Sequence, residues 1–393
     1  MIREEALTLI GEMLAPLSAD QFFADYLGQR VGSVPGSSGH PRAGLLGPDP
    51  RATILAAWQT HPSLFGFHAD GVTGPPPVRD GVDGPDAFAA LVAEHQARGY
   101  TVHVPDLAPL SPPLRRLMRA FEFMLHQPVK ASLFWSRPGN RAPVHYDDRD
   151  NITIQLVGVK RWFVSTEPAS LHNAWRDVAE PSAPLGPAQT IEAAPGHLLF
   201  IPRGVRHTVE TLEESLHLSI TLMPVTVREA MIAALDHLSD YDRTLRETAL
   251  GRADRLGADL ETIRLRTMDG LQRLLEQCRS PAFVGSALQR RSSRFVGDLP
   301  KLSPSPEPAA LSANTILQQT GGAMSVMLAT PDQIDFAQPG LHINVHRAAE
   351  AALRFIAATP HFRLGEVPGL DGELRIALVR RLLQSGFLRA EPN

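Results

Sequence analysis

Hydrophobic residues recur with two different periods along the chain, and this division predicts a mixed fold. Between residues 131 and 224, short runs rich in apolar and β-branched residues are separated by Pro, Gly and Asp, as is typical of strands joined by turns. Strands this short and this regularly spaced favour a sandwich or barrel. The seven runs are ASLFWS, NITIQLVG, KRWFVST, AQTIEAA, HLLFIP, RHTVETL and SLHLSITLM.

The segments on either side of these runs have mainly helical periodicity. In the first 130 residues, the pattern at 113–126 predicts a helix among Pro- and Gly-rich connections. We therefore expect helices and loops packed around the strand-rich part. Residues 227–288 predict two or three helices.

The C-terminal part combines a Ser- and Pro-rich segment with a small mixed region. Residues 292–313 predict a linker without regular structure. Beyond it we expect strands at 323–328 and 340–345 and helices at 348–358 and 372–385, a pattern similar to a winged-helix module. The last 47 residues carry 7 basic and 5 acidic groups, so a DNA-reading surface is not expected.

Composition narrows the class of protein. The chain has 393 residues, 43% hydrophobic and 20% charged, with a net charge of −4, which fits two or three globular domains and argues against electrostatic nucleic-acid binding. Its single cysteine, Cys278, excludes a disulfide framework and is expected to be a small buried hydrophobe. The N-terminus lacks a signal-peptide pattern, and no apolar run reaches the ~18 residues of a membrane helix. We therefore expect a cytoplasmic protein with no membrane association.

Candidate chemistry lies in PVHYDDRDNITIQLVGVKRWFV at 143–164 and GHLLFIPRGVRHTVE at 196–210. His145 and Asp147 are one residue apart, so both side chains point to one face at the start of a strand. His207 follows a turn before a later strand and offers a third ligand. Two histidines and one carboxylate form the facial triad that leaves coordination positions open on Fe(II).

The spacing of a histidine and an aspartate one residue apart is weak evidence for a metal site, because His68 and Asp70 have the same spacing. This second pair lies in a Gly- and Pro-rich region without a later histidine in a comparable turn. We therefore interpret it as a chance match and His145 with Asp147 as the metal-binding pair.

The string HYDDRDNITIQLVGVKRW followed by IPRGVRHTVE resembles the JmjC-type 2-oxoglutarate oxygenases, specifically the cupin-4 branch that includes the ribosomal oxygenases. Residues 98–122 are also similar to the segment before the first core strand in that branch. The resemblance implies an α+β fold with a double-stranded β-helix (jelly-roll, cupin, JmjC) core. It also implies an order of regions: a catalytic domain with N-terminal helices at 1–225, a helical dimerisation domain at 226–291, the linker at 292–313, and a winged-helix-like domain at 314–393.

The resemblance assigns roles to individual residues. The iron ligands fall on His145, Asp147 and His207, and Lys160 occupies the position that pairs with the distal carboxylate of 2-oxoglutarate. An unpaired carboxylate in an apolar barrel is costly, and an ammonium removes that penalty. The neighbouring Arg161 is the alternative partner. Strand alternation allows only one of the two to enter the barrel, and we favour Lys160.

Further pocket candidates are less specific. Asn151 matches an Asn found near the cosubstrate in some JmjC asparagine hydroxylases, and Trp135 falls where ribosomal oxygenases commonly have a Tyr lining the pocket. Leu133 replaces a frequent Asn. Ser219 and Thr221 lie on the last predicted barrel strand and are candidates for the pocket wall, although either can simply be a strand residue.

The resemblance implies hydroxylation of a C–H bond with Fe(II), 2-oxoglutarate and O₂. The implied substrate is an amino-acid side chain in a protein, with ribosomal proteins as the family precedent, and the implied assembly is a homodimer. Hydroxylation of a peptide natural product precursor or a free amino acid is the first alternative, and JmjC demethylation is another. A non-catalytic cupin-like binding or regulatory protein is the alternative from a different class.

Overall fold

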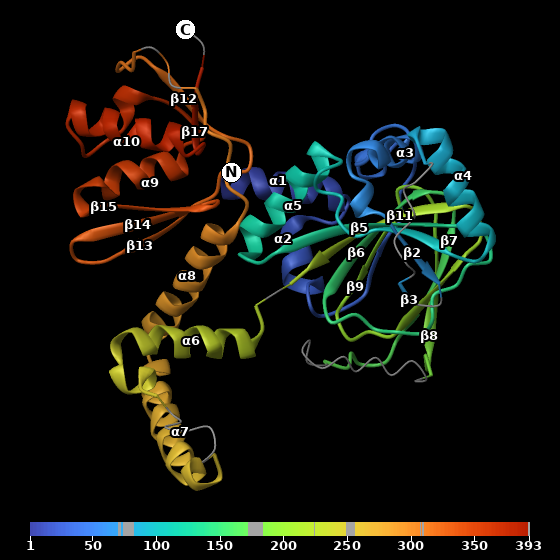
Figure 1. Cartoon of the computed structure of the whole chain (residues 1–393), viewed down its shortest axis with the longest axis horizontal. Helices are drawn as coiled ribbons and strands as arrows, with labels where there is room; N and C mark the ends of the chain where they lie inside the picture. Colours follow the sequence, from blue (N-terminus) through green and yellow to red (C-terminus); the bar gives the residue numbers. More distant parts are fainter. Residues whose placement is uncertain are drawn as a thin grey trace. The chain divides into compact units, whose positions relative to one another are not determined.

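The computed structural model describes residues 1–69, 72–73, 82–171, 184–223, 225–248, 256–306, 308 and 310–391. The chain divides into two compact units (Figure 1), one comprising Arg3–Pro224 and the other Met1–Ile2 with Val225–Asn393. Each unit has its own elements and core. Asp70, half of the chance His-x-Asp match, lies outside the described residues.

All seven predicted strands are present in the first unit, in two antiparallel sheets. They are β5 (Val129–Ser136), β6 (Asp150–Val157), β7 (Lys160–Ser165), β8 (Ala188–Ala193), β9 (Leu198–Ile201), β10 (His207–Thr211) and β11 (Ser215–Leu222). The smaller sheet has the order β10-β7-β8. Apolar side chains from both sheets, among them Trp162, Val164, Leu199 and Val209, form a buried cluster. The strand-rich centre of the chain is therefore a two-sheet core.

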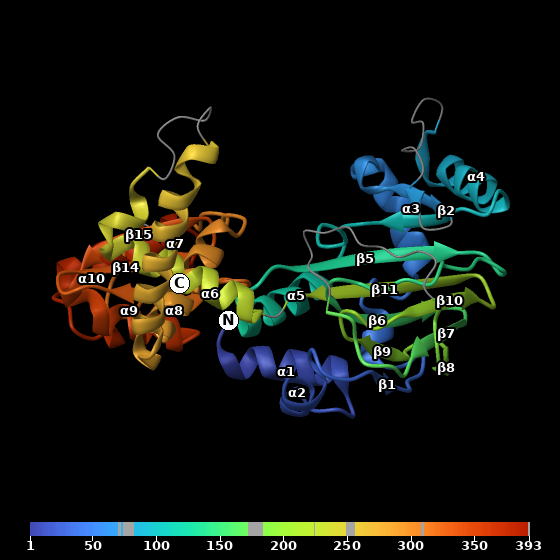
Figure 2. The same cartoon turned by 90° about the horizontal axis from the view of Figure 1, so that it is seen from below.

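The larger sheet also recruits strands from the first 130 residues, where only helices and loops were expected. These are β1 (Gly32–Val34), β2 (Gly66–Ala69), β3 (Val72–Thr73) and β4 (Thr101–Val104). The sheet order is β1-β9-β6-β11-β5-β4-β2-β3, and Figure 2 shows β1, β9, β6, β11 and β5 stacked in this order. The added strands have only two to four residues, which is too short for a clear alternating pattern. The expectation for this region was wrong for that reason.

Helices of the first unit pack as two groups. The first contains α1 (Arg3–Leu14), α2 (Ala19–Gln21), the π-helix Phe22–Tyr26 and α5 (Pro112–Leu125). Its Phe22 ring contacts Phe200 of β9 edge-to-face at 5.0 Å and Phe121 at 6.3 Å. The second contains α3 (Pro50–Thr60) and α4 (Gly84–Ala97), joined by the stacked Trp58 and Phe88 rings. Short 3-10 helices lie at Pro41–Gly44 and Pro62–Leu64.

The predicted helix at 113–126 corresponds to α5 and is confirmed. Ser111 caps its start by accepting a hydrogen bond from the Leu114 N–H at 3.2 Å, and Pro112 occupies the first turn. His126 ends the helix in the left-handed conformation, with φ of 47°. Local signals alone therefore determine both ends of α5.

The second unit begins with three long helices, as predicted. They are α6 (Val227–Tyr241), α7 (Leu256–Cys278) and α8 (Pro281–Asp298), with a 3-10 turn at Arg243–Arg246. The predicted start of the linker at 292 is wrong, because α8 continues to Asp298. Ser293 and Val296 are buried in this last part of α8, which keeps it helical. Cys278 is only half-buried, not fully buried as expected.

The C-terminal part contains more strands than the sequence indicated. One sheet pairs β16 (His361–Arg363), β12 (Ile316–Gln319) and β17 (Leu388–Ala390), and the other pairs β13 (Val326–Ala329), β14 (Gln333–Gln338) and β15 (Leu341–His346). Helices α9 (Glu350–Ala358) and α10 (Gly372–Gln384) share one hydrophobic core with these sheets, and short 3-10 helices lie at Arg347–Ala349 and Leu364–Glu366. Among the described residues, no helix is long and apolar enough to cross a membrane.

Candidate active site

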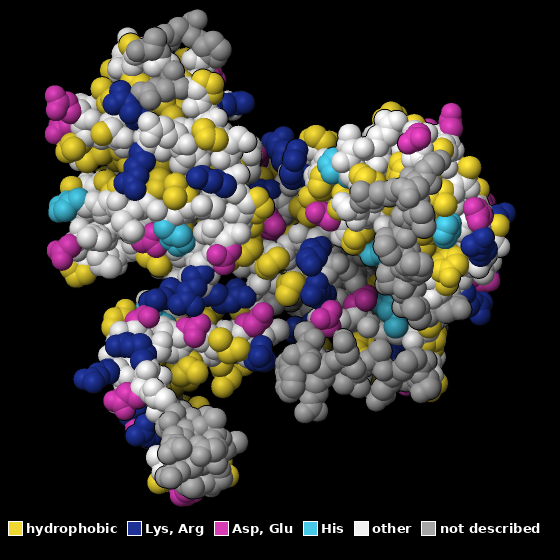
Figure 3. Space-filling model, in the orientation of Figure 1, with side chains coloured by type: hydrophobic (Ala, Val, Ile, Leu, Met, Phe, Trp, Pro, Cys, Tyr) yellow, Lys and Arg dark blue, Asp and Glu magenta, His cyan; other side chains and the backbone are white. Residues whose placement is uncertain are grey.

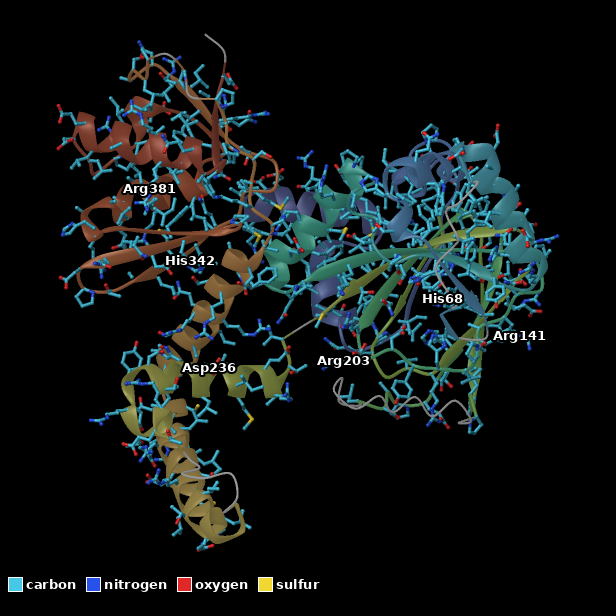
Figure 4. The ribbon with its side chains drawn as sticks, in the orientation of Figure 1. His68, Arg141, Arg203, Asp236, His342 and Arg381 are labelled. Atoms are coloured by element: carbon cyan, nitrogen blue, oxygen red, sulfur yellow. The ribbon has the colours of Figure 1, made fainter. Side chains whose placement is uncertain are left out.

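A cavity of about 860 Å³ lies in the first unit, between its two sheets. Side chains of β5, β6 and β11, extended by β2 and β4, line one wall, and β7 and β10 line the other. The segment 139–147 completes the lining. His68 and Arg141, labelled in Figure 4, both belong to this lining. The cavity is therefore enclosed by elements far apart in the sequence.

The three predicted metal ligands meet in this cavity. His145, Asp147 and His207 each place one ligand atom within 4.8 Å of the others, and they form the only such group of three among the described residues. The backbones of His145 and His207 form a reciprocal pair, with N–H···O distances of 3.0 and 2.8 Å. This pair fixes the spacing of the two imidazoles, while the Asp147 carboxylate lies 3.6 Å from His207 Nε2.

Each imidazole is held by a backbone carbonyl in the tautomer that a metal requires. His145 Nδ1 lies 2.8 Å from the Pro143 carbonyl oxygen, and His207 Nδ1 lies 3.0 Å from that of Val205. A carbonyl only accepts, so each Nδ1 carries a proton, and in the neutral ring the lone pair is then on Nε2. Burial lowers the pKa of His207, which favours the neutral ring. Two neutral imidazoles and a carboxylate are a donor set that fits Fe(II).

Asn151, Ser219 and Thr221 all lie in the cavity wall, and together they hold Asp147. The Asn151 amide N–H donates to Asp147 Oδ2. Its carbonyl oxygen accepts hydrogen bonds from Thr221 Oγ1 at 2.9 Å and Ser219 Oγ at 3.3 Å. Partners of this kind orient a metal ligand. The geometry therefore places Asn151 as a positioning residue for the carboxylate.

Lys160 points into the same cavity and Arg161 does not, as strand alternation predicts. Lys160 is only 2% exposed, and its Nζ donates to Ser136 Oγ at 3.1 Å. Burial lowers its pKa to about 7. Asp147, which Asn151 already holds, is the only acidic residue in the described lining. Arg161 instead pairs with Glu192 on the opposite face at 2.7 Å.

The prediction that Trp135 lines the pocket is wrong. On β5 the cavity-facing side chains are Ser132, Phe134 and Ser136. Successive residues of a strand point to opposite faces, so Trp135 and Leu133 face away from the cavity. The Trp135 indole donates to Glu214 Oε1 at 2.8 Å. Phe134 is therefore the aromatic residue that β5 contributes to the pocket.

Sequence reasoning missed a row of aromatic rings that crosses the larger sheet. His217 on β11 stacks on Phe134 with centroids 5.0 Å apart, Phe134 stacks on His103 of β4 at 4.6 Å, and His103 contacts His68 of β2 at 4.3 Å. Burial lowers the pKa of His217 well below its ordinary value and that of His103 to about 4. The sequence did contain a signal for His217: it alternates with Leu216 and Leu218, so it lies on the same face of the strand as the pocket candidate Ser219.

Comparison with known proteins places residues of this site within one matched domain. A profile of the JmjC domain family matches residues 111–230, which contain the triad and Lys160. Ribosomal oxygenase 2 of Rattus norvegicus is 28% identical over 144 residues, covering 35% of this chain and 30% of its own length. Ribosomal oxygenase 1 of Gallus gallus is 23% identical over 346 residues, covering 82% and 57%. Residues 111–230 therefore match the JmjC domain, and the predicted resemblance is confirmed.

Solved structures extend the likeness to almost the whole chain. YcfD, a ribosomal oxygenase from Escherichia coli in complex with cobalt and 2-oxoglutarate, has a TM-score of 0.53 and 19% identity over 96% of this chain and 99% of its own. Its complex with cobalt and succinic acid gives a TM-score of 0.55 and 18% identity. At such identities the match shows a shared fold. The chain spans 30% of the length of ribosomal oxygenase 2 and 57% of the length of ribosomal oxygenase 1.

Proposed function

We propose that this chain is an Fe(II)- and 2-oxoglutarate-dependent oxygenase that hydroxylates an amino-acid side chain of a protein. One observation carries the proposal: the same cavity is lined by a His-Asp-His donor set and by a buried lysine that has no acidic partner among the described residues. A buried cation without a counter-ion is costly, so it favours a ligand with a carboxylate. A dicarboxylic 2-oxo acid can bind a metal on the His-Asp-His set with one end and Lys160 with the carboxylate at the other end.

In this proposal the protein residues divide the work. His145, Asp147 and His207 would hold the metal, and Asn151 keeps Asp147 in place. Lys160 binds the distal carboxylate and so orients the 2-oxo acid. Iron bound there supplies the O₂ chemistry that hydroxylates an unactivated C–H bond.

The relatives favour a protein substrate. Those of known name are ribosomal oxygenases and the Drosophila proteins called bifunctional lysine-specific demethylase and histidyl-hydroxylase NO66. We infer that this chain acts on a side chain of a ribosomal protein. A cytoplasmic location stays a prediction.

Mass spectrometry of a panel of ribosomal-protein peptides tests this function. The peptides are incubated with Fe(II), 2-oxoglutarate and O₂, and succinate is measured in parallel. One added oxygen atom on a peptide, with matching succinate, is the expected result, whereas loss of a methyl group from a methyl-lysine peptide indicates demethylation instead. Absence of any product from all ribosomal peptides contradicts the proposed substrate class. Absence of 2-oxoglutarate binding by the Mn(II)-loaded protein contradicts the oxygenase itself.

We also propose that the helical region forms a homodimer. Helices α6 and α7 expose an unusually large number of large hydrophobic side chains for a protein surface. Figure 3 shows hydrophobic surface over α6. The exposed side chains are Val227, Met231, Ile232, Leu235, Tyr241, Leu260, Leu265, Met268, Leu271 and Leu275. Light scattering on the purified protein is expected to give the mass of two chains. The double variant Met231→Glu, Leu235→Glu is expected to shift it to one, and a wild-type monomer contradicts the dimer.

A further inference from the structure

His217 is the most deeply buried titratable group of the cavity that the proposed function leaves without a role. It is 5% exposed, lies on β11 and belongs to the cavity lining. Phe134 stacks on one face of its ring, and Trp162 contacts it at 5.5 Å with an interplanar angle of 82°. Two aromatic neighbours therefore fix the plane of the imidazole.

The ring nitrogen Nδ1 of His217 has no partner. Within the described residues no atom forms a hydrogen bond with it, although it is fully shielded from the surface. Trp162 Nε1, which can only donate, is buried and unpartnered in the same way. Unsatisfied buried polar atoms are rare, because each costs the free energy of its lost hydration. Both atoms are shielded from the cavity as well, so a ligand atom reaches them only when the side chains around them move aside.

Lys160 adds a third donor to this group. It precedes Trp162 by two residues on β7, so both side chains share a face, and its charge is close enough to lower the pKa of His217. Its ammonium has three N–H bonds, of which Ser136 accepts one. Lys160, His217 and Trp162, here called the donor group, therefore combine one cation with several free N–H bonds.

We propose that His217 binds the distal carboxylate of the cosubstrate together with Lys160, donating a hydrogen bond from Nδ1–H to one carboxylate oxygen while the ammonium binds the other. This inference rests on the proposed function and adds a residue that selects dicarboxylic over monocarboxylic 2-oxo acids. A neutral imidazole suits this task, since it donates a hydrogen bond without placing a second buried positive charge beside Lys160.

Gln155 offers the competing explanation for the unpartnered nitrogen. It faces His217 across the β6–β11 pairing, and its Oε1 is also buried and without a partner. A small rotation that joined these two atoms would make His217 a structural residue. The two explanations differ in one measurable respect: only a residue that contacts the distal carboxylate responds to the presence of that carboxylate.

The test is a comparison of two variants with two ligands by calorimetry on the Mn(II)-loaded protein. His217→Phe keeps an aromatic ring but removes Nδ1, and His217→Asn keeps a donor near the Nδ1 position. We expect His217→Phe to weaken 2-oxoglutarate binding about 10–100-fold, the value of a hydrogen bond to a charged group, and His217→Asn to recover most of it. With 2-oxopentanoate, which has the same chain length without the distal carboxylate, wild type and both variants are expected to bind equally.

Each contrary outcome has a separate meaning. Equal 2-oxoglutarate affinity in wild type and His217→Phe overturns the role of His217 and leaves the proposed function standing. A loss of the same size for both ligands also overturns it and favours the structural role with Gln155. Failure of the wild-type protein to bind 2-oxoglutarate overturns the proposed function and this inference together. Thermal unfolding of each variant establishes that it is folded, and His217→Asn keeps the test open if His217→Phe is not.

Discussion

The cavity contains two groups of polar side chains that differ in how completely the protein satisfies them. In the metal group, which consists of His145, Asp147 and His207, each side chain already has a hydrogen-bond partner. A backbone carbonyl contacts Nδ1 of each histidine, and Asn151 donates to Oδ2 of Asp147. In the donor group, two buried ring nitrogens, Nδ1 of His217 and Nε1 of Trp162, have no hydrogen-bond partner among the described residues. The first group is pre-organised without its ligand, whereas the second is complete only when an anion is present.

This difference has an energetic meaning. Hydrogen bonds to the outer atoms of a metal ligand reduce the reorganisation that binding requires, so the metal group should bind in one geometry. A buried lysine without a counter-ion instead destabilises the free protein, and that cost is recovered when a carboxylate binds. The metal group therefore determines where the metal binds. The donor group destabilises the free protein, and binding of the cosubstrate removes this destabilisation.

The largest expected effect comes from breaking the metal group. Asp147→Ala removes the only carboxylate of the triad and should lower metal affinity and 2-oxoglutarate turnover by more than about 100-fold, since even partners of metal ligands change affinity by 10–100-fold. Its neighbour Asp148, which pairs with Arg149 at 3.5 Å, is the matched control. Asp148→Ala should leave both quantities nearly unchanged. Similar losses in the two variants would contradict the assignment of the ligand.

The next effect separates two adjacent basic residues. Lys160→Met should weaken 2-oxoglutarate binding about 10–100-fold, because the distal carboxylate loses a charged partner. Arg161→Met should change it little, since the exposed pair with Glu192 contributes about 1 kcal/mol or less. Calorimetry with the Mn(II)-loaded protein measures both. A larger loss in Arg161→Met would mean that the donor group has been assigned to the wrong side of β7.

A smaller effect tests how far the outer hydrogen bonds support the metal group. Asn151→Ala removes the donor to Asp147 Oδ2 and should lower metal affinity about 10-fold, at the lower end of the range for such partners. Thr221→Ala removes only a bond to Asn151 and should cost less. Competition with a chelator gives the affinities. Unchanged metal binding in Asn151→Ala would show that Asp147 needs no support.

The two groups also differ in how much of them the sequence could predict. The metal group was predicted from the spacing of His145 and Asp147 together with its context, a following strand and His207 after a recognisable turn, because His68 and Asp70 show that the spacing alone was not sufficient. Lys160 followed from resemblance and from the alternation that separates it from Arg161. Both signals are short-range in sequence, and both agreed with the position of the side chain in the cavity.

The rest of the site depends on strand pairing, which short-range signals do not contain. Trp135 was predicted to line the pocket because the sequence does not show which residues of β5 face the cavity, and Phe134 lies there instead. His103 reaches the cavity only because the four-residue β4 pairs with β5. The same limit explains the missed strands of the first 130 residues. The helices, in contrast, were predicted well, since their caps and periods are local, except that α8 extends seven residues into the predicted linker.

The smallest expected effect concerns stability and tests the cost assigned to the donor group. Removing a buried, unpaired charge should stabilise the cosubstrate-free protein, so Lys160→Met should unfold at a temperature a few degrees higher than wild type, with 1 kcal/mol giving about 2–4 °C for a unit of this size. Saturating Mn(II) and 2-oxoglutarate should reverse the order, because only wild type gains the full binding free energy. A less stable Lys160→Met in the free state would contradict the cost assigned to Lys160.

The pH dependence of this difference follows from the same pKa. Lys160 has a pKa of about 7 in the folded protein, below its ordinary 10.5, so the unfolded chain holds more protons between these values. Stability rises with pH wherever the unfolded state binds more protons. Wild type should therefore gain stability relative to Lys160→Met from pH 7 to pH 10, and the advantage of the variant should shrink across this window. Denaturant unfolding of both proteins at several pH values measures the difference, in which the titration of all other groups cancels. A constant difference would mean that Lys160 keeps its ordinary pKa and has an anionic partner even without the cosubstrate.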